Sequence, residues 1–159
     1  MKQITEQEAY LRLAALCAQA EHCQYEMQEK MRRWELSKEA QARVMQRLVT
    51  ERYVDDERYA RAFIKDKVRY NKWGRRKVEQ ALWAKHIDED IRQRVLEEVD
   101  DEEYIAVLRP LLQQKRKSTK ANSDYELNGK LIKFAMSRGF TMDIIKQCIN
   151  VTDEDEFLD

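Results

Sequence analysis

Three stretches of this sequence repeat one pattern of apolar residues, and this repeat constrains the fold more than any other feature. Residues 25–49, 74–99 and 128–149 align on five shared apolar positions. The aligned residues are Met27, Val78 and Leu131; Met31, Leu82 and Ala135; Leu36, Ile87 and Phe140; Ala40, Ile91 and Ile144; and Val44, Val95 and Cys148. Self-similarity of this kind is the signature of repeat architectures, in which stacked neighbours complete one another's core.

Polar residues mark the same point in each copy. Ser37, Asp88 and Thr141 each follow the third aligned apolar residue and precede the next apolar-periodic run. Oxygen atoms of such side chains accept hydrogen bonds from the free N–H groups at a helix start. We therefore expect a helix to begin immediately after each of these three residues.

The segment before each helix pair also repeats. Residues 55–68 resemble residues 100–112, so that Tyr59 matches Tyr104 and Phe63 matches Leu108. A third version near the start of the sequence opens with Thr5 and Glu8, the spacing of a capping box. The repeating unit is thus three helices in roughly 45–50 residues, a length typical of helical repeats. The residues assigned to its core in the middle copy are Tyr59, Phe63, Leu82, Ile87 and Val95.

Only three glycines and one proline interrupt the 159 residues, of which 38% are charged and 43% apolar. Because Gly and Pro supply the turns of β-rich folds, their scarcity favours helices throughout. The predicted fold is all-α: three tandem three-helix repeats, helix-turn-helix-like, stacked into an elongated, curved array. The predicted repeats span 1–50, 51–99 and 100–150, and 151–159 is expected to be a disordered acidic tail.

The helix pattern also has one predicted loop and one predicted irregularity. The expected helices cover residues 5–22, 24–33, 38–50, 56–70, 74–84, 88–98, 101–116, 124–137 and 141–149. Residues 115–124 are the one obvious loop. Pro110 lies where a helix interior is wanted, so we expect a kink or a break there.

Positive charge gathers in one part of a chain whose net charge is zero. Between residues 65 and 85, eight Lys and Arg residues stand against Asp66 and Glu79, a net charge of about +6. An acidic block over 97–103 supplies part of the compensating charge. Such asymmetry steers an anionic partner to one face, and both nucleic-acid phosphates and acidic protein patches fit.

Two further basic stretches extend this prediction. One lies on the predicted loop after residue 114, and the other lies beside Trp34; on a curved array they would line one concave surface. The residues predicted to bind a partner are Arg32, Arg33, Lys72, Arg75, Arg76, Lys77, Lys115, Arg116, Lys117 and Lys120. The competing interpretation is that these residues form only a solvated face, as most helical Lys and Arg do.

Two residues inside the main basic stretch have alternative roles. Trp73 stacks on a base or a partner side chain, or else it fills the space between two helices, which is the commoner role. Gly74 serves close packing or the start of a helix, since glycine lets the backbone turn where a β-carbon would obstruct it. Asp55 and Asp56 are interpreted as helix caps.

Nothing in the sequence predicts catalysis. It has no Gly-rich phosphate loop, and neither His22 nor His86 comes with a nucleophile in a known motif. Cys17, His22 and Cys23 fit no common zinc spacing, so we expect no metal and no cofactor. The absence of an export signal or of a membrane-length apolar run favours a cytoplasmic protein with reduced thiols, not bound to a membrane.

The middle of the chain resembles the RecX family of bacterial regulatory proteins. The shared residues are Val54, Asp55, Asp56, Tyr59 and Ala60, followed by Gly74, Arg75, Arg76, Val78 and Leu82. The resemblance extends over residues 5–150. RecX proteins often carry glycine before the Val/Ile–Asp stretch and after the second helix of a repeat. This chain has Arg52, Glu35 and His86 at those places, and only Gly139 keeps the pattern.

The resemblance implies a regulatory protein without enzymatic activity that binds the filament formed by the recombinase RecA on DNA. It further implies inhibition of the filament's ATPase, strand-exchange and co-protease activities, and hence modulation of recombination, DNA repair and the SOS response. We expect weak, non-specific DNA contact and a monomer. One alternative is a helical DNA-binding protein acting directly on nucleic acid, although a pI near 6.8 is low for that class. Another is a helical-repeat scaffold for an unrelated partner.

Overall fold

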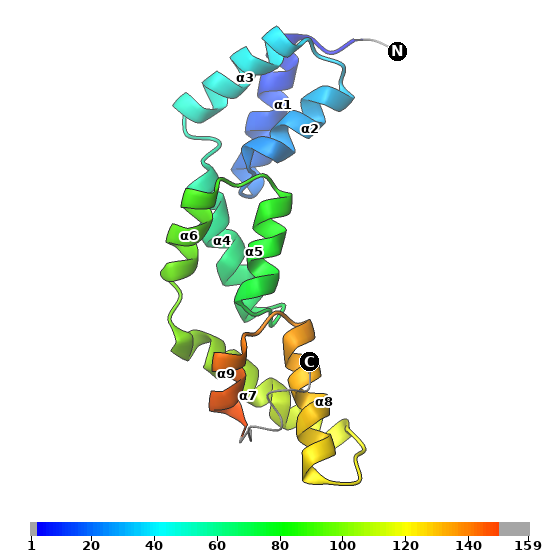
Figure 1. The fold of residues 1–159 in the computed structure, drawn as a ribbon. Helices are drawn as coiled ribbons and strands as arrows, with labels where there is room; N and C mark the ends of the chain where they lie inside the picture. The colour runs from blue at the N-terminus through cyan, green and yellow to red at the C-terminus, as the bar shows by residue number, and fades with distance from the viewer. Residues whose placement is uncertain (1–2, 150–159) are drawn as a thin grey trace. The chain divides into compact units, whose positions relative to one another are not determined.

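The computed structural model describes residues 3–149, and these residues contain nine α-helices and no strand (Figure 1). The all-α class is therefore confirmed. In chain order the helices are α1 (Glu6–Gln19), α2 (Gln24–Arg33), α3 (Lys38–Thr50), α4 (Asp56–Arg69), α5 (Arg75–Ala84), α6 (Glu89–Glu97), α7 (Asp101–Ser118), α8 (Asp124–Ser137) and α9 (Met142–Cys148). The predicted acidic tail lies outside the described residues.

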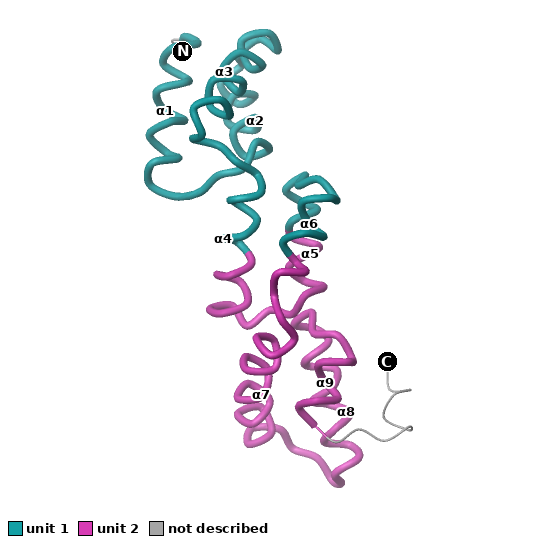
Figure 2. Tube along the Cα trace, turned by 90° about the vertical axis from the view of Figure 1, so that its left-hand side faces the viewer, with its two compact units in different colours: residues 1–63, 82–95 teal, residues 64–81, 96–159 magenta. Residues whose placement is uncertain are grey.

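The chain divides into two compact units (Figure 2). Unit 1 comprises residues 1–63 and 82–95, and unit 2 comprises residues 64–81 and 96–159. Helices α4, α5 and α6 each contribute residues to both units. The division into three repeats at residues 50 and 99 is a separate, sequence-based description, and it stays a prediction.

The core of unit 1 is built from the apolar positions that the repeat defines. Helix α3 packs against both α1 and α2, and its Val44 lies in one cluster with Met27 and Met31 of α2. Four of the five residues assigned to the core of the middle copy are buried: Tyr59, Leu82, Ile87 and Val95. The periodic pattern therefore predicts most of these core residues.

Phe63 is the exception among the predicted core residues, because its side chain is only half-buried. Its ring lies beside that of Tyr59, with 5.8 Å between the ring centroids. The buried residue at this point of α4 is Ile64, which is 2% exposed. Successive residues on a helix point about 100° apart, so an error of one position moves a side chain off the core face.

The three short turns that follow α2, α5 and α8 have the same structure. Glu35, His86 and Gly139 have positive φ angles of 58°, 58° and 93°. The next residue of each turn donates its backbone N–H to the carbonyl oxygen five residues earlier: Leu36 to Met31 (3.3 Å), Ile87 to Leu82 (3.2 Å) and Phe140 to Ala135 (3.2 Å). This bond and a left-handed residue form the Schellman motif that ends many helices. The turn geometry is therefore kept where the glycine of the family pattern is absent.

Several predicted helix caps are confirmed. The side-chain oxygens of Thr5, Ser37 and Asp55 each accept a hydrogen bond from the backbone N–H three residues later, at 3.1, 3.1 and 3.0 Å. These bonds satisfy N–H groups that have no partner inside the helix. These side-chain hydrogen bonds between near neighbours therefore stabilise the points at which α1, α3 and α4 begin.

Two other predicted caps differ in detail. As expected, α9 begins immediately after Thr141, but the Thr141 side chain accepts no capping hydrogen bond. Asp56 is a helix cap, as predicted, but of another helix: its Oδ1 accepts a hydrogen bond of 2.8 Å from the backbone N–H of Gln24, the first residue of α2. Asp56 thus caps a helix 32 residues away in the sequence, which a local pattern does not reveal.

Unit 2 contains α7, α8 and α9 packed against one another. Its core includes Leu108, Leu131, Phe140 and Ile145, all at most 1% exposed. These residues come from α7, α8, the turn after α8, and α9, so the core of this unit draws on every one of its C-terminal elements.

Helix α7 continues through Pro110, so the break that was one of the two expected outcomes there is absent. The helix ends at Ser118, so the predicted loop over 115–124 is shorter than expected. Pro110 and Ala106 are both exposed, and water can solvate the Ala106 carbonyl for which Pro110 supplies no N–H donor. Lys115, Arg116 and Lys117 consequently lie on the last turn of a helix, and of the predicted site residues only Lys120 lies in the loop.

Candidate functional site

The turn between α4 and α5 carries the centre of the predicted basic site, and the turn after α8 holds it in place. The backbone N–H of Gly74 donates to the carbonyl oxygen of Arg138 (2.8 Å), and that of Arg76 donates to the carbonyl oxygen of Gly139 (3.0 Å). A β-carbon added at Gly74 would lie 2.3 Å from the backbone nitrogen of Phe140. This contact shows the close packing predicted for Gly74, and Gly74 also directly precedes α5, so both predicted roles are confirmed.

Most of the predicted site residues lie in one compact unit. Lys72, Arg75, Arg76, Lys77, Lys115, Arg116, Lys117 and Lys120 belong to unit 2, whereas Arg32 and Arg33 belong to unit 1. Within unit 2, the side chains of Arg75 and Lys77 are half-buried and those of the other six are exposed. The six exposed side chains can contact a macromolecular anion without any rearrangement of the core.

Trp73 is surrounded by the chain's own cations. Its indole ring lies 4.9 Å from Nζ of Lys77 and 5.2 Å from Nζ of Lys67, both measured to the ring centroid. These are distances at which an ammonium group is attracted by the negative face of an aromatic ring. Trp73 is half-buried, so it is neither a fully buried filler between helices nor a fully exposed stacking platform.

Tyr70, which the sequence analysis did not select, is the aromatic residue of this turn that faces solvent. It is 72% exposed and follows Arg69 at the end of α4. Its position outside the apolar period of α4 was the signal that could have identified it. An exposed ring among cations can stack on an unpaired base while the cations meet the backbone phosphates.

Arg138 is a second residue that the sequence analysis missed. Its Nη1 donates to the carbonyl oxygen of Asn71 (3.3 Å), so its guanidinium lies at the turn between α4 and α5. It also lies 5.3 Å from the centroid of the Phe134 ring, and Nζ of Lys115 lies 4.9 Å from the same centroid. Only the packing of the helices brings this cation to the turn, because Arg138 and Asn71 are 67 residues apart.

The loop that contains Lys120 is also tied to a helix. Lys130 of α8 donates from Nζ to the carbonyl oxygen of Lys120 (2.6 Å) and forms an ion pair with Glu126 at 3.3 Å. The side chain of Lys120 itself remains exposed. The loop therefore presents this cation from an anchored backbone.

The two predicted site residues of unit 1 stand at the end of α2. Nη2 of Arg32 lies 2.5 Å from Oε2 of Glu29, and this arginine side chain is 71% exposed. Arg33 is exposed and precedes Trp34, whose ring centroid lies 5.8 Å from the guanidinium carbon of Arg12.

The two cysteine thiols of unit 1 have raised pKa values. Burial raises the pKa of Cys23 to about 11, and burial also raises the pKa of Cys17. A thiol with a raised pKa is a weak nucleophile and a weak metal ligand at neutral pH.

Among residues 3–149, no group of three or more His, Cys, Asp and Glu side chains is arranged to hold a metal ion. Over the same residues, no helix is both long enough and apolar enough to span a bilayer.

Comparison with protein families identifies two domains. The family profile for the second three-helix domain of RecX matches residues 55–96, and the profile for the third three-helix domain of RecX matches residues 101–149. Together these ranges contain the turn between α4 and α5 and eight of the ten predicted site residues.

Individual relatives carry the same description. The regulatory protein RecX of Lactobacillus delbrueckii subsp. bulgaricus is 30% identical over 135 residues, which is 82% of this chain and 50% of that protein. The regulatory protein RecX of Bacillus cytotoxicus is 24% identical over 150 residues, which is 94% of this chain and 56% of that protein. The chain thus spans about half the length of the curated relatives it matches.

Solved structures show a similar fold. The crystal structure of RecX from Lactobacillus salivarius superposes with a TM-score of 0.81 at 18% identity, covering 90% of this chain and 93% of that one. A crystal structure of a regulatory protein RecX gives the same TM-score at 15% identity, covering 90% of this chain and 70% of that one. The helical-repeat fold is shared with both.

Proposed function

Because this chain belongs to the RecX family, we propose that it is a regulatory protein of the RecA nucleoprotein filament. In this proposal it binds the filament and lowers its ATPase, strand-exchange and co-protease activities, and so modulates recombination, DNA repair and the SOS response. It acts as a cytoplasmic monomer, without a cofactor and without a catalytic step of its own.

The observation that carries the proposal is the group of cations in unit 2. A chain with no net charge gathers eight predicted site residues there, and packing adds Arg138. A filament of protein on DNA offers phosphates and acidic side chains together, and clustered exposed cations favour both by long-range attraction. We propose that Arg32 and Arg33 of unit 1 contribute a second, smaller contact.

The test is the single-stranded-DNA-dependent ATP hydrolysis of RecA, titrated with this protein at moderate salt. The proposal expects inhibition at far less than one copy per RecA monomer, because blocking or dismantling a filament affects many monomers at once. Inhibition that begins only when the protein covers the DNA would instead indicate simple competition for the lattice.

A charge-reversal variant connects the activity to the site. R76E/R116E/K117E changes three exposed side chains of unit 2, and surface changes of this kind usually alter stability by no more than about 0.5 kcal/mol each. We expect it to lose most of its inhibition, whereas the control R76K/R116K/K117R, which retains every charge, inhibits normally. Unchanged inhibition by the reversed variant would show that these cations are only a solvated face.

A second candidate function is direct binding to single-stranded DNA, which the 72% exposure of Tyr70 beside Arg69 favours. Phosphate contacts make such binding steeply salt-dependent between about 50 and 200 mM. The variant Y70A separates the two functions. A large loss of oligonucleotide affinity with unchanged inhibition of RecA would assign Tyr70 to DNA alone, and a tight, sequence-specific footprint on naked duplex would contradict the filament proposal.

A further inference from the structure

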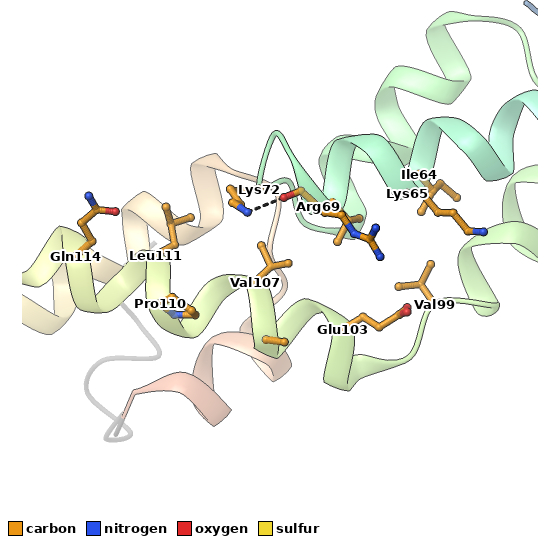
Figure 3. A pocket seen from close by; sticks show the side chains of 12 residues that line it. Ile64, Lys65, Arg69, Lys72, Val99, Glu103, Val107, Pro110, Leu111 and Gln114 are labelled. Carbon is orange, nitrogen blue, oxygen red and sulfur yellow. Dashed lines mark hydrogen bonds between the residues drawn. The ribbon is translucent and has the colours of Figure 1, made fainter. Parts of the chain in front are cut away.

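Unit 2 contains an open groove of about 410 Å³ between the end of α4 and helix α7 (Figure 3). From α7 and the residues just before it, one stripe of side chains lines the groove at helical spacing. From α4, two apolar side chains line the other wall. The apolar lining residues are Ile64, Val68, Val99, Ala106, Val107, Pro110 and Leu111. The groove therefore offers an apolar floor large enough for one or two bulky side chains.

The charged side chains around this floor are mostly positive. Lys65, Arg69 and Lys72 lie along the α4 side at spacings of four and three residues, so they follow one face of the helix and its turn (Figure 3). Nζ of Lys72 donates to the carbonyl oxygen of Arg69 (2.6 Å), which keeps this lysine at the rim. Glu103 on α7 is the acidic lining residue. An occupant with two or more carboxylates and an apolar pair would complement this arrangement.

The sequence itself contains a segment of that chemistry. Residues 151–159 read VTDEDEFLD, in which Asp153, Glu154, Asp155 and Glu156 directly precede Phe157 and Leu158. We propose that this segment binds in the groove of its own chain, with Phe157 and Leu158 on the apolar floor and the preceding carboxylates against Lys65, Arg69 and Lys72.

The described chain leads to the groove over a short distance. Near the end of α9, the carbonyl oxygen of Gln147 accepts a hydrogen bond of 2.9 Å from Nη2 of Arg109 on α7. Arg109 is the immediate neighbour of Pro110, which lines the groove, and adjacent helical residues point about 100° apart. The segment therefore needs to pass around less than half of α7.

The length of the segment is sufficient for that path. A helix with its side chains is about 10–12 Å across, and ten residues after Ile149 can extend to roughly 33 Å. A tether of this length also keeps the segment at an effective concentration in the millimolar range next to the groove, so even weak attraction favours the bound form. An identical segment on a second molecule lacks this advantage at ordinary protein concentrations.

Occupancy of the groove would place carboxylates on Lys72, one of the predicted partner-binding residues, and on the nearby Lys65 and Arg69. The segment would then compete with anionic partners for Lys65, Arg69 and Lys72, and residues 151–159 would act as a built-in competitor. This consequence rests on the function proposed above, whereas occupancy of the groove does not.

The experiment compares methyl NMR spectra of the full chain and of its F157A/L158A variant. We expect the methyl signals of Val99, Val107 and Leu111 to shift in the variant, and the shift to be the same at low and high protein concentration. The control L11A/V49A removes two exposed apolar side chains of unit 1 (55% and 40% exposed) and should leave these signals unchanged. Groove signals that do not move in F157A/L158A, or that move only at high concentration, would overturn binding within one chain.

A second measurement tests the competition. Replacing the four carboxylates in the full chain, as D153N/E154Q/D155N/E156Q, should strengthen binding to a single-stranded oligonucleotide several-fold at low ionic strength. Unchanged affinity in this variant, together with the expected methyl shifts, would overturn the competition and count against the proposed partner site while occupancy of the groove stands. The two parts of the inference therefore fail separately.

Discussion

The backbone of Gly74 lies directly against the backbone of Phe140. A β-carbon built at Gly74 would come within 2.3 Å of the Phe140 nitrogen and 2.4 Å of its α-carbon, and both are backbone atoms that cannot swing aside. This contact joins the turn that carries Lys72 and Arg75 to the turn that ends α8. The basic site thus depends on one residue without a side chain.

The variant Gly74→Ala should therefore be unstable. We expect it to lose at least about 2 kcal/mol of unfolding free energy, since added atoms in a packed contact force the backbone to move. Urea unfolding followed by circular dichroism measures this loss. The control Asn71→Ala changes an exposed side chain of the same turn and should stay within about 0.5 kcal/mol of the parent. Equal stability of Gly74→Ala and the parent would show that the two turns separate easily.

Glu35→Gly should stabilise the protein. Glu35 is exposed and has a φ of 58°, a conformation that costs a residue with a β-carbon about 1 kcal/mol and glycine almost nothing. We expect a gain of about 0.5–1 kcal/mol in thermal or urea unfolding. Glu39→Gly, at an exposed position of α3, should instead lose a similar amount. A loss in both variants would mean that the left-handed turn carries no strain.

Glu26→Gln should reduce stability at neutral pH but not in acid. Burial by itself raises the pKa of Glu26, but hydrogen bonds from Lys85 (3.1 Å) and the backbone N–H of Cys23 (3.2 Å) outweigh it, and the pKa is lowered from 4.5. A carboxylate with a lowered folded-state pKa stabilises the fold above its unfolded pKa, and this contribution disappears as the pH falls through the folded value.

We therefore expect Glu26→Gln to cost about 1 kcal/mol at pH 7, a modest value because the ion pair is partly solvated. The difference should shrink once the pH falls below about 4.5. Urea unfolding over a pH series measures it, and Glu97→Gln, at an exposed position on α6, serves as the control. A difference that grows in acid would contradict the assigned direction of the pKa shift.

Leu82→Ala tests the core that the repeat predicts. Leu82 is fully buried, and truncation of such a leucine costs about 2–5 kcal/mol through lost apolar contact and the cavity that remains. Leu11→Ala removes the same atoms from a side chain that is 55% exposed, and it should cost no more than about 0.5 kcal/mol. Similar melting temperatures for the two variants would place Leu82 outside the core.

Some elements of the fold were predictable to the residue. The expected helices over 24–33, 38–50 and 124–137 coincide with α2, α3 and α8. For α3, both the apolar period and the Ser37 cap lie within the helix itself or directly beside it. Structure of this kind depends on side chains three and four residues apart, which a single sequence displays.

The predicted site was less accessible to sequence reasoning. The basic residues were identifiable by their charge, but the contacts of Arg138 with Asn71 and of Trp73 with two lysines were not. The expected loop at residue 115 is instead helix, because the exposed position of Pro110 lets α7 continue. Each of these features depends on where a distant segment or the solvent lies.

The sequence by itself thus determined the helices, the three copies of the apolar pattern and the concentration of positive charge between residues 65 and 85. The tertiary structure alone decided that Asp56 caps α2, that Ile64 and not Phe63 is buried, and that Gly74 meets Phe140. The physical reason is the distance along the sequence between the residues that interact. Helix formation and capping are governed by neighbours within about one turn, whereas these contacts join residues brought together only when the apolar faces of separate helices pack.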